Sequence, residues 1–251
     1  MSGEIRIARA SSERERELRR EFVELLKATP IPDDELLAQL GLYLNRQALS
    51  RILFMHELYR LVLGVPGVVI ELGVRWGQNL ALWSSFRGMY EPYNHARRIV
   101  GFDTFSGFPS VSGEDGGADV ASAGAYGVDE GYDEYLRSVL HYHGQESPLS
   151  HLERFELVRG DATAAVPEYL AARPETVIAL AYFDFDLYEP TRTALEAIRP
   201  HLTRGSVIGF DQLGSRTFPG ETLAVQEVLG LPELRLVRSP YAAQACYVVL
   251  D

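Results

Sequence analysis

The sequence predicts an α/β fold: a doubly wound, mostly parallel seven-stranded sheet with a C-terminal antiparallel hairpin and additional N-terminal helices. Two observations carry this prediction. From residue 68 onward, short apolar runs typical of buried strands alternate with helical patterns, as in a parallel sheet covered by helices on both faces. The last two strand-like runs are separated only by residues 240–244, too few for a parallel crossover, so these strands should pair antiparallel.

The N-terminal part of the chain has helical patterns. Residues 10–29 are expected to form an amphipathic helix, because Leu18, Phe22 and Leu25 recur at helical spacing. A Pro-containing break follows, and a second helical stretch is expected over roughly residues 33–63. We expect residues 1–63 to form a helical extension or lid and residues 64–251 to form the main domain.

The strands and helices of the main domain follow in order. Strands are expected at residues 68–74, 98–103, 154–160, 177–186, 205–211, 234–239 and 245–250. Helices are expected between several of them, notably over 77–89 and 190–202. Residues 104–152 interrupt this alternation as a long insertion, whose first half is rich in Gly, Ala and Ser and lacks a packing face. Loops of this length are usually lids, binding loops or disordered, and we expect a lid.

Composition excludes some partners. The chain has 24 Lys and Arg against 35 Asp and Glu, a net charge of −11, which argues against binding DNA or RNA. Its one cysteine, Cys246, cannot form an internal disulfide and fits a reducing cytoplasm. Neither a signal-peptide core nor a membrane-spanning apolar run is evident, so we expect a cytoplasmic protein without a membrane partner. The amphipathic N-terminal helices predict a homo-oligomer, a dimer or larger.

The turn after the first strand is expected to bind a nucleoside-containing cofactor. Gly73 and Gly77 allow a tight turn and close approach of a ligand to the backbone, and the helix that starts near Asn79 offers free N–H groups to a carboxylate. Glu71 lies at the end of the strand that leads into this turn. The spacing differs from the dinucleotide fingerprint G-x-G-x-x-G, which argues against a nicotinamide dehydrogenase.

The next two strands also end in acids. Asp103 is placed to hold the two ribose hydroxyls of a nucleoside, and Ser106 follows it in the adjoining loop. Asp161 and Ala162 end the third strand, where an adenine base would lie. The alternative is that Asp103 and Asp161 only cap the helices that follow them.

A second group of acids follows the fourth and fifth strands. Asp184 and Asp186 lie at the end of an apolar run, and Asp211 ends the next one. Carboxylates at the ends of neighbouring strands are close enough to share a magnesium ion or, without a cation, a proton. We favour a functional role for Asp184, whereas Asp186 is better explained as the N-cap of the helix over 190–202.

Three segments of the sequence, residues 65–77, 100–109 and 184–191, resemble the macrocin O-methyltransferase family. The resemblance covers about residues 40–250. It implies a Rossmann-like class I methyltransferase that uses S-adenosylmethionine and a divalent cation, Mg²⁺, to methylate a sugar hydroxyl in antibiotic biosynthesis. Within the family, this acidic and short chain is most similar to members that methylate the 3-hydroxyl of TDP-rhamnose.

The resemblance also implies roles for individual residues. Asp184 corresponds to the family's catalytic base and to its first metal ligand. The family's Asp-Asp pair, which supplies the other ligands, corresponds to Asp211 and Gln212, so the last ligand is a neutral amide. A weakened, solvent-exchanging or absent metal is therefore compatible with the sequence.

These observations predict methyl transfer to a sugar or sugar-nucleotide hydroxyl. Asp184 would accept the hydroxyl proton, and a cation between Asp184 and Asp211 would lower the pKa of that hydroxyl. Two alternatives stay open: a metal-dependent methyltransferase of catechols or phenols, and a non-catalytic nucleoside-binding subunit, which Gln212 in place of an acid would suit.

Overall fold

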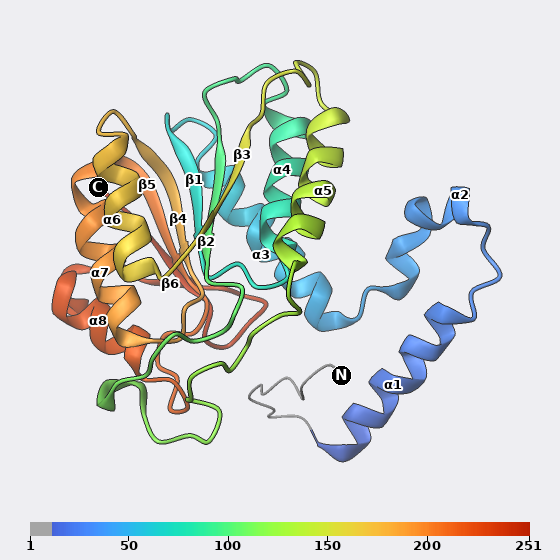
Figure 1. Ribbon diagram of the computed structural model, residues 1–251, viewed down its shortest axis with the longest axis horizontal. Helices are drawn as coiled ribbons and strands as arrows, with labels where there is room; N and C mark the ends of the chain where they lie inside the picture. The colour runs from blue at the N-terminus through green and yellow to red at the C-terminus, as the bar shows by residue number, and fades with distance from the viewer. Residues whose placement is uncertain (1–11) are drawn as a thin grey trace.

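A computed structural model describes residues 12–251 and shows the seven-stranded sheet that the sequence predicts. Its strand order is β3-β2-β1-β4-β5-β7-β6 (Figure 1). The strands are β1 (Val68–Leu72), β2 (Ile99–Asp103), β3 (Phe155–Arg159), β4 (Ile178–Phe183), β5 (Leu202–Phe210), β6 (Val237–Arg238) and β7 (Cys246–Val249). Strands β1 to β5 run parallel, and β7 pairs antiparallel with both β5 and β6. The predicted C-terminal hairpin is therefore confirmed.

Helices cover both faces of the sheet (Figure 1). One face packs against α3 (Arg46–Leu61), α4 (Gln78–Tyr90) and α5 (Tyr132–Gln145), and the other against α6 (Ala162–Ala172), α7 (Tyr188–Ile198) and α8 (Gly220–Val228). Strand residues alternate between the two cores: Leu180 and Tyr182 of β4 face the first group of helices, and Ala181 and Phe183 face the second. Short 3₁₀ helices at η2 (Gly113–Asp115), η3 (Arg199–His201) and η4 (Leu231–Glu233) complete the main domain.

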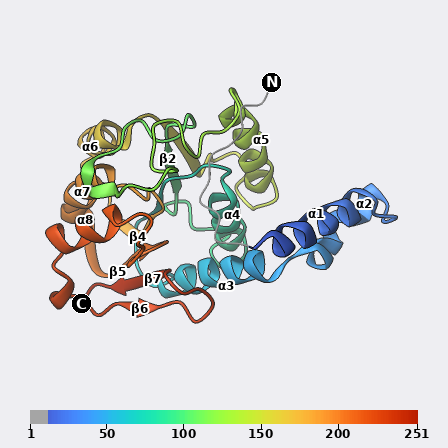
Figure 2. The ribbon, with the colours of Figure 1, turned by 90° about the horizontal axis from the view of Figure 1, so that it is seen from below.

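Helix α1 (Glu13–Lys27) and the residues that follow it up to α3 project away from the sheet (Figure 2). The N-cap of α1 is Ser12, which forms a capping box with Glu15, and the helix buries none of its residues. Residues 1–11, which include the start of the predicted first helix and of the predicted extension, lie outside the described residues. Among residues 12–251, no helix has the length and apolar character needed to cross a membrane.

The stretch expected to be helical over residues 33–63 is divided in the structure. It consists of α2 (Asp33–Leu36), η1 (Leu37–Tyr43) and α3. The break has a local cause: Asn45 adopts an extended conformation, and its side-chain oxygen accepts the Ala48 N–H at 2.8 Å, which starts a new helix. Only α3 packs on the sheet, and it buries Phe54, Met55 and Leu58 among its residues.

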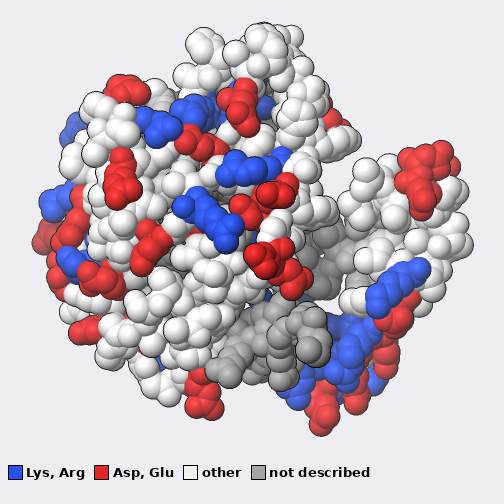
Figure 3. All heavy atoms as spheres, in the orientation of Figure 1, with Lys and Arg blue, Asp and Glu red and all other residues white. Residues whose placement is uncertain are grey.

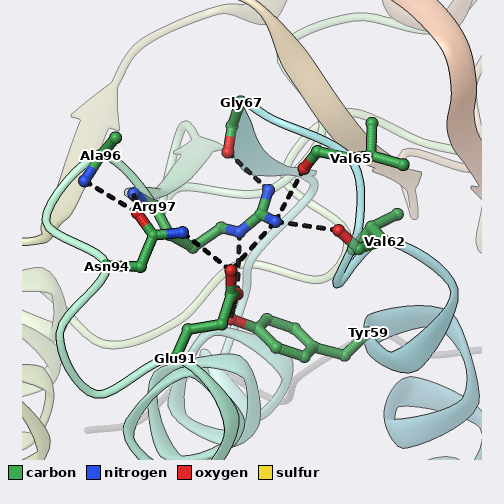
Figure 4. A network of polar contacts seen from close by, with 8 residues as sticks. All are labelled: Tyr59, Val62, Val65, Gly67, Glu91, Asn94, Ala96 and Arg97. Atoms are coloured by element: carbon green, nitrogen blue, oxygen red, sulfur yellow. Dashed lines mark hydrogen bonds and ion pairs between the residues drawn. The ribbon is translucent and has the colours of Figure 1, made fainter.

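A buried arginine fastens the end of α3 to the sheet (Figure 4). The Arg97 side chain is 1% exposed and pairs with Glu91 at 2.9 Å. Its guanidinium also donates to the main-chain carbonyls of Val62, Val65 and Gly67, at 2.9, 2.8 and 2.6 Å. The segment that links α3 to β1 is thereby held against the end of α4, so the position of α3 over the sheet is determined at its C-terminal end.

The insertion over residues 104–152 is more ordered than its composition suggests. Its second half contains α5, and in its first half Asp115 and Ala125 are buried. Asp115 accepts the backbone N–H of Tyr188 at 2.6 Å, which joins the insertion to the first turn of α7. The expectation that the first half of this segment lacks a packing face is therefore wrong: Asp115 and Ala125 are buried, and the contact of Asp115 with Tyr188 joins segments 73 residues apart, which no periodic pattern reveals.

Charged side chains are mixed on the surface. On the face shown in Figure 3, Lys and Arg side chains are interspersed with Asp and Glu rather than collected in one basic surface. The predicted absence of a nucleic-acid partner stays a prediction, and this face gives no reason to revise it.

Candidate active site

A cavity of about 290 Å³ opens at the carboxyl ends of the parallel strands. Each of these five strands contributes a lining residue from its end or from the two positions that follow it: Gly73, Asp103, Asp161, Asp184 and Asp211. In this sheet β2 and β4 are the two neighbours of β1, so the strand order reverses its direction at β1. The cavity therefore lies at the topological switch point, where α/β proteins bind ligands. The predicted grouping of acids at one sheet edge is what the structure shows.

The turn after β1 depends on its glycines. Gly73 has φ +99°, and a Cβ there would lie 2.2 Å from the carbonyl oxygen of Asp184. Gly77 has φ +76° and is the N-cap of α4, where a Cβ would collide with Leu136 of α5. The turn can therefore approach both the end of β4 and α5 only without side chains at these positions.

Glu71 and Asn79 lie next to this turn but do not line the cavity. The Asn79 amide donates to Glu71 at 2.7 Å, and both side chains are buried. Burial raises the pKa of Glu71 to about 8. The second oxygen of Glu71 and the amide oxygen of Asn79 are buried without a hydrogen-bond partner in the described residues. The pair joins β1 to the first turn of α4, and its direct contact with a cofactor stays a prediction.

Asp103 and Asp161 line the cavity and also bond to the protein. Asp103 accepts backbone N–H groups from Val74, Arg75 and Phe105, at 2.7, 2.8 and 2.6 Å. A carboxylate has about four acceptor positions, so one stays available to a ligand hydroxyl. Asp161 caps α6 through the Thr163 N–H at 2.9 Å.

The capping alternative and the ligand-binding prediction are therefore compatible for Asp161, because capping occupies only one of its oxygens. Ala162, the first residue of α6, lines the cavity, and its contact with an adenine base stays a prediction. Ser106 is exposed and is not among the lining residues, whereas its neighbours Thr104 and Gly107 are.

Asp184 and Asp211 are linked by a cation that belongs to the chain. The Arg51 guanidinium, from α3, lies 3.4 Å from Asp184 and 2.8 Å from Asp211. The Tyr182 hydroxyl donates to the same oxygen of Asp211 at 2.7 Å. Burial and the nearby Asp211 raise the pKa of Asp184 well above its ordinary value, although Arg51 acts in the opposite direction. A carboxylate with a raised pKa holds a proton more readily than an ordinary aspartate, so Asp184 has the character of a proton acceptor.

The predicted magnesium site does not fit this arrangement. The three expected ligands, Asp184, Asp211 and Gln212, all line the cavity. However, only two of them are charged, and the guanidinium of Arg51 already bridges both carboxylates. Within residues 12–251 no group of three or more His, Cys, Asp or Glu side chains is arranged to hold a metal ion. The donor set is therefore that of an arginine–carboxylate cluster rather than a magnesium centre.

Asp186 does not cap α7, contrary to the sequence-based prediction. The helix begins at Tyr188, its N-cap is Leu187, and Asp115 supplies the acceptor for the first N–H group. Asp186 instead adopts φ +66° and is 5% exposed, with one carboxylate oxygen unpartnered among the described residues. Burial raises the pKa of Asp186 to about 8. Strand β4 ends at Phe183, three residues before the predicted strand end, so Asp186 lies in the loop between β4 and α7.

Several cavity residues were not identified from the sequence. Arg51 lies more than a hundred residues from its partners in the chain, and no local motif marks it. Arg75 lies in the turn after β1, and its guanidinium is 5.0 Å from the ring centroid of Tyr126 and 5.7 Å from that of Trp76. Its φ of +49° shows that the turn constrains it. Tyr126 belongs to the insertion, so the insertion forms part of the cavity wall.

Comparisons with known proteins point in one direction. The chain is similar to the crystal structure of CalS11, described as a calicheamicin methyltransferase, with 46% identity, 99% of this chain and 97% of that chain covered, and a TM-score of 0.93. It is also similar to the apo structure of CalS11, described as a TDP-rhamnose 3'-O-methyltransferase, with 44% identity, 96% of each chain covered and a TM-score of 0.85. The O-methyltransferase NovP, at 23% identity, 80% coverage of each chain and a TM-score of 0.61, shares the fold.

A curated relative agrees with these structures. The 8-demethyl-8-(2,3-dimethoxy-alpha-L-rhamnosyl)-tetracenomycin-C 4'-O-methyltransferase of Streptomyces olivaceus is 30% identical over 159 residues, which cover 59% of this chain. The match spans about half the length of that relative, 53%. No protein-family model matches the chain.

Proposed function

The chain belongs to the family of S-adenosylmethionine-dependent sugar O-methyltransferases that includes CalS11, and from this premise we propose that it methylates a hydroxyl of a nucleotide-linked deoxysugar. The specific acceptor that we propose is the 3-hydroxyl of TDP-rhamnose, the substrate named for CalS11. The observation that carries the proposal is Asp184, a carboxylate with a raised pKa that lines the cavity at the switch point of the sheet.

The cavity residues suit the proposed cofactor. Asp103 has an acceptor position left for ribose hydroxyls, and Ala162 offers a small apolar contact for the adenine. The turn at Gly73 brings main-chain groups close to a ligand, and helix N-termini favour carboxylates. When bound, S-adenosylmethionine supplies a sulfonium methyl group that an oxygen nucleophile can accept.

Asp184 supplies the base in this proposal. Asp184 would accept the hydroxyl proton when the acceptor oxygen takes the methyl group that bound S-adenosylmethionine would supply, with adenosylhomocysteine as the leaving group. The raised pKa of Asp184 favours this transfer, because a carboxylate with a higher pKa is a stronger base than an ordinary aspartate. Holding the hydroxyl and the methyl group together in one cavity supplies a further part of the rate enhancement.

A methyl-transfer assay tests the proposal. Purified protein is incubated with isotopically labelled S-adenosylmethionine and, separately, TDP-rhamnose, TDP-glucose and catechol, and products are identified by mass spectrometry. We expect labelled methyl-rhamnose on the nucleotide sugar. Labelling of catechol with no labelling of either nucleotide sugar would overturn the acceptor class.

Asp184→Asn tests the role of the base. This variant should lower kcat by roughly 10²–10⁴-fold, the usual contribution of a general base. The matched control is Glu189→Gln, because Glu189 is an exposed acid on α7 whose ion pair within residues 12–251 is with Arg192 at the surface. Near-full turnover by Asp184→Asn on the accepted sugar would show that another group takes the proton.

We also propose that the chain is a homo-oligomer. Helix α1 buries no residue of its own, and it leaves Leu18 and Leu25, which lie two turns apart on one face, 47% and 64% exposed. An apolar stripe of this kind is stabilised by packing on another surface. Light scattering after size exclusion should give at least twice the mass of one chain, and Leu18→Glu combined with Leu25→Glu should reduce it.

A further inference from the structure

Arg51 separates two cavities at the carboxyl edge of the sheet. The first is the cavity described above. The second, of about 550 Å³, lies between α3, the end of β4 and the loop before β7. Arg51 and Asp211 are the residues that line both. The guanidinium therefore lies at the junction between the proposed cofactor cavity and a neighbouring space.

The position of the Arg51 guanidinium is set by its partners. One of its terminal nitrogens is 2.8 Å from Asp211 and the other 3.4 Å from Asp184, so the planar group spans the two carboxylates. Burial disfavours the charge of Arg51, but Asp211 and Asp184 outweigh that effect and raise its pKa above its ordinary value. The guanidinium is therefore a permanent positive charge between the two acids.

A divalent cation shared by these carboxylates would need the same space. Magnesium binds oxygen ligands at about 2.0–2.1 Å in octahedral geometry, which requires several oxygens to face one point. Here one oxygen of Asp211 already accepts both Arg51 and Tyr182, and the remaining predicted ligand, Gln212, has no charge. A second cation would also be repelled by the guanidinium a few ångströms away.

We propose that Arg51 is the resident cation of this site, so that the chain works without a divalent metal between Asp184 and Asp211. Arg51 acts as a positioning residue: it holds Asp184 toward the cavity and balances part of the charge of the two acids. Its role in methyl transfer rests on the function proposed above, whereas its exclusion of metal does not. The two parts can therefore be tested separately.

Manganese binding tests the exclusion of metal without any acceptor sugar. Mn²⁺ is titrated into the wild type, Arg51→Met and Arg60→Met, and free Mn²⁺ is followed by electron paramagnetic resonance. Arg60→Met is the control, because Arg60 is exposed in the last turn of the same helix. We expect no binding by the wild type or the control up to about 1 mM, and binding at least roughly tenfold tighter by Arg51→Met, because the repelling charge is gone.

Two results would overturn the proposal at this stage. One is micromolar Mn²⁺ binding by the wild type that disappears in Asp211→Asn. The other is a folded Arg51→Met variant that, like the wild type, binds no Mn²⁺. If Arg51→Met does not fold, Arg51→Lys takes its place: a lysine keeps the charge, so this variant should exclude Mn²⁺ as the wild type does, and tight binding by it would count against the proposal.

The methyl-transfer assay tests the second part. We expect the wild-type rate to change less than about twofold after treatment with EDTA, and Arg51→Met to lose at least roughly tenfold in kcat and to recover part of it when Mg²⁺ is added. Loss of the wild-type rate in EDTA with recovery in Mg²⁺ would refute metal-free catalysis. If no sugar is methylated at all, the proposed function fails, while the Mn²⁺ titration still decides what Arg51 does.

Discussion

Replacing Arg97 by methionine should destabilise the chain more than a typical substitution. The guanidinium is buried, pairs with Glu91 and donates to three main-chain carbonyls. Removing one partner of a buried ion pair usually costs about 3–5 kcal/mol, because the other charge stays buried without compensation. In a domain of this size each kcal/mol lowers Tm by roughly 2–4 °C, so the expected fall is roughly 6–20 °C.

Thermal unfolding followed by circular dichroism at pH 7.5 measures this effect, and a double-mutant cycle identifies its cause. Glu91→Gln removes the charge and keeps one acceptor oxygen, which can serve either Tyr59 or Asn94, because these two side chains donate to different oxygens of Glu91. If the cost comes from the unpaired carboxylate, Arg97→Met together with Glu91→Gln should be more stable than the sum of the single effects by about 1 kcal/mol or more. Additive effects, or a fall in Tm below about 3 °C for Arg97→Met, would refute the reasoning.

Three further predictions concern residues around the cavity. Burial raises the pKa of Glu221 well above its ordinary value, so the folded chain keeps a proton that the unfolded chain releases above about pH 4.5. The free energy of unfolding of the wild type should therefore fall as pH rises. Glu221→Gln should make this pH dependence flatter in urea titrations between pH 5 and 9. Gly73→Ala should cost at least about 2 kcal/mol and most activity, because the added Cβ would lie 2.2 Å from the Asp184 carbonyl; a variant with wild-type Tm and rate would contradict this. Asn79→Leu should cost about 1–3 kcal/mol and raise the pKa of Glu71 above its present value of about 8, as followed by the carboxyl carbon chemical shift.

The part of the fold that was predictable has a physical reason. Buried parallel strands are continuous apolar runs, and the chain must return to the same edge after each one, so the acids that follow the strands collect in one place. That logic located Gly73, Asp103, Asp161, Asp184 and Asp211, which all line one cavity. It also located the antiparallel hairpin, because five residues cannot make a parallel crossover.

The residues that were missed depend on contacts between distant segments. Arg51 comes from a helix of the N-terminal extension, and its partners are 133 and 160 residues away. Asp186 was assigned to the helix that follows it, but Asp115 of the insertion provides the cap instead. In both cases the local sequence pattern could be explained without the distant residue. The sequence alone therefore did not indicate that a distant partner was needed.

The contact between Asp115 and Tyr188 also affects how the sugar substrate of such a chain could be changed. Gly220, at the start of α8, meets the same point: a Cβ there would lie 2.3 Å from Asp115 and 2.5 Å from the Tyr188 nitrogen. The insertion, the segment after Asp184 and the start of α8 are therefore assembled as one unit. A chimera that exchanges the insertion between relatives should keep its function only when Asp115 and Gly220 are transferred or retained together, which makes these two positions the natural markers for choosing crossover points.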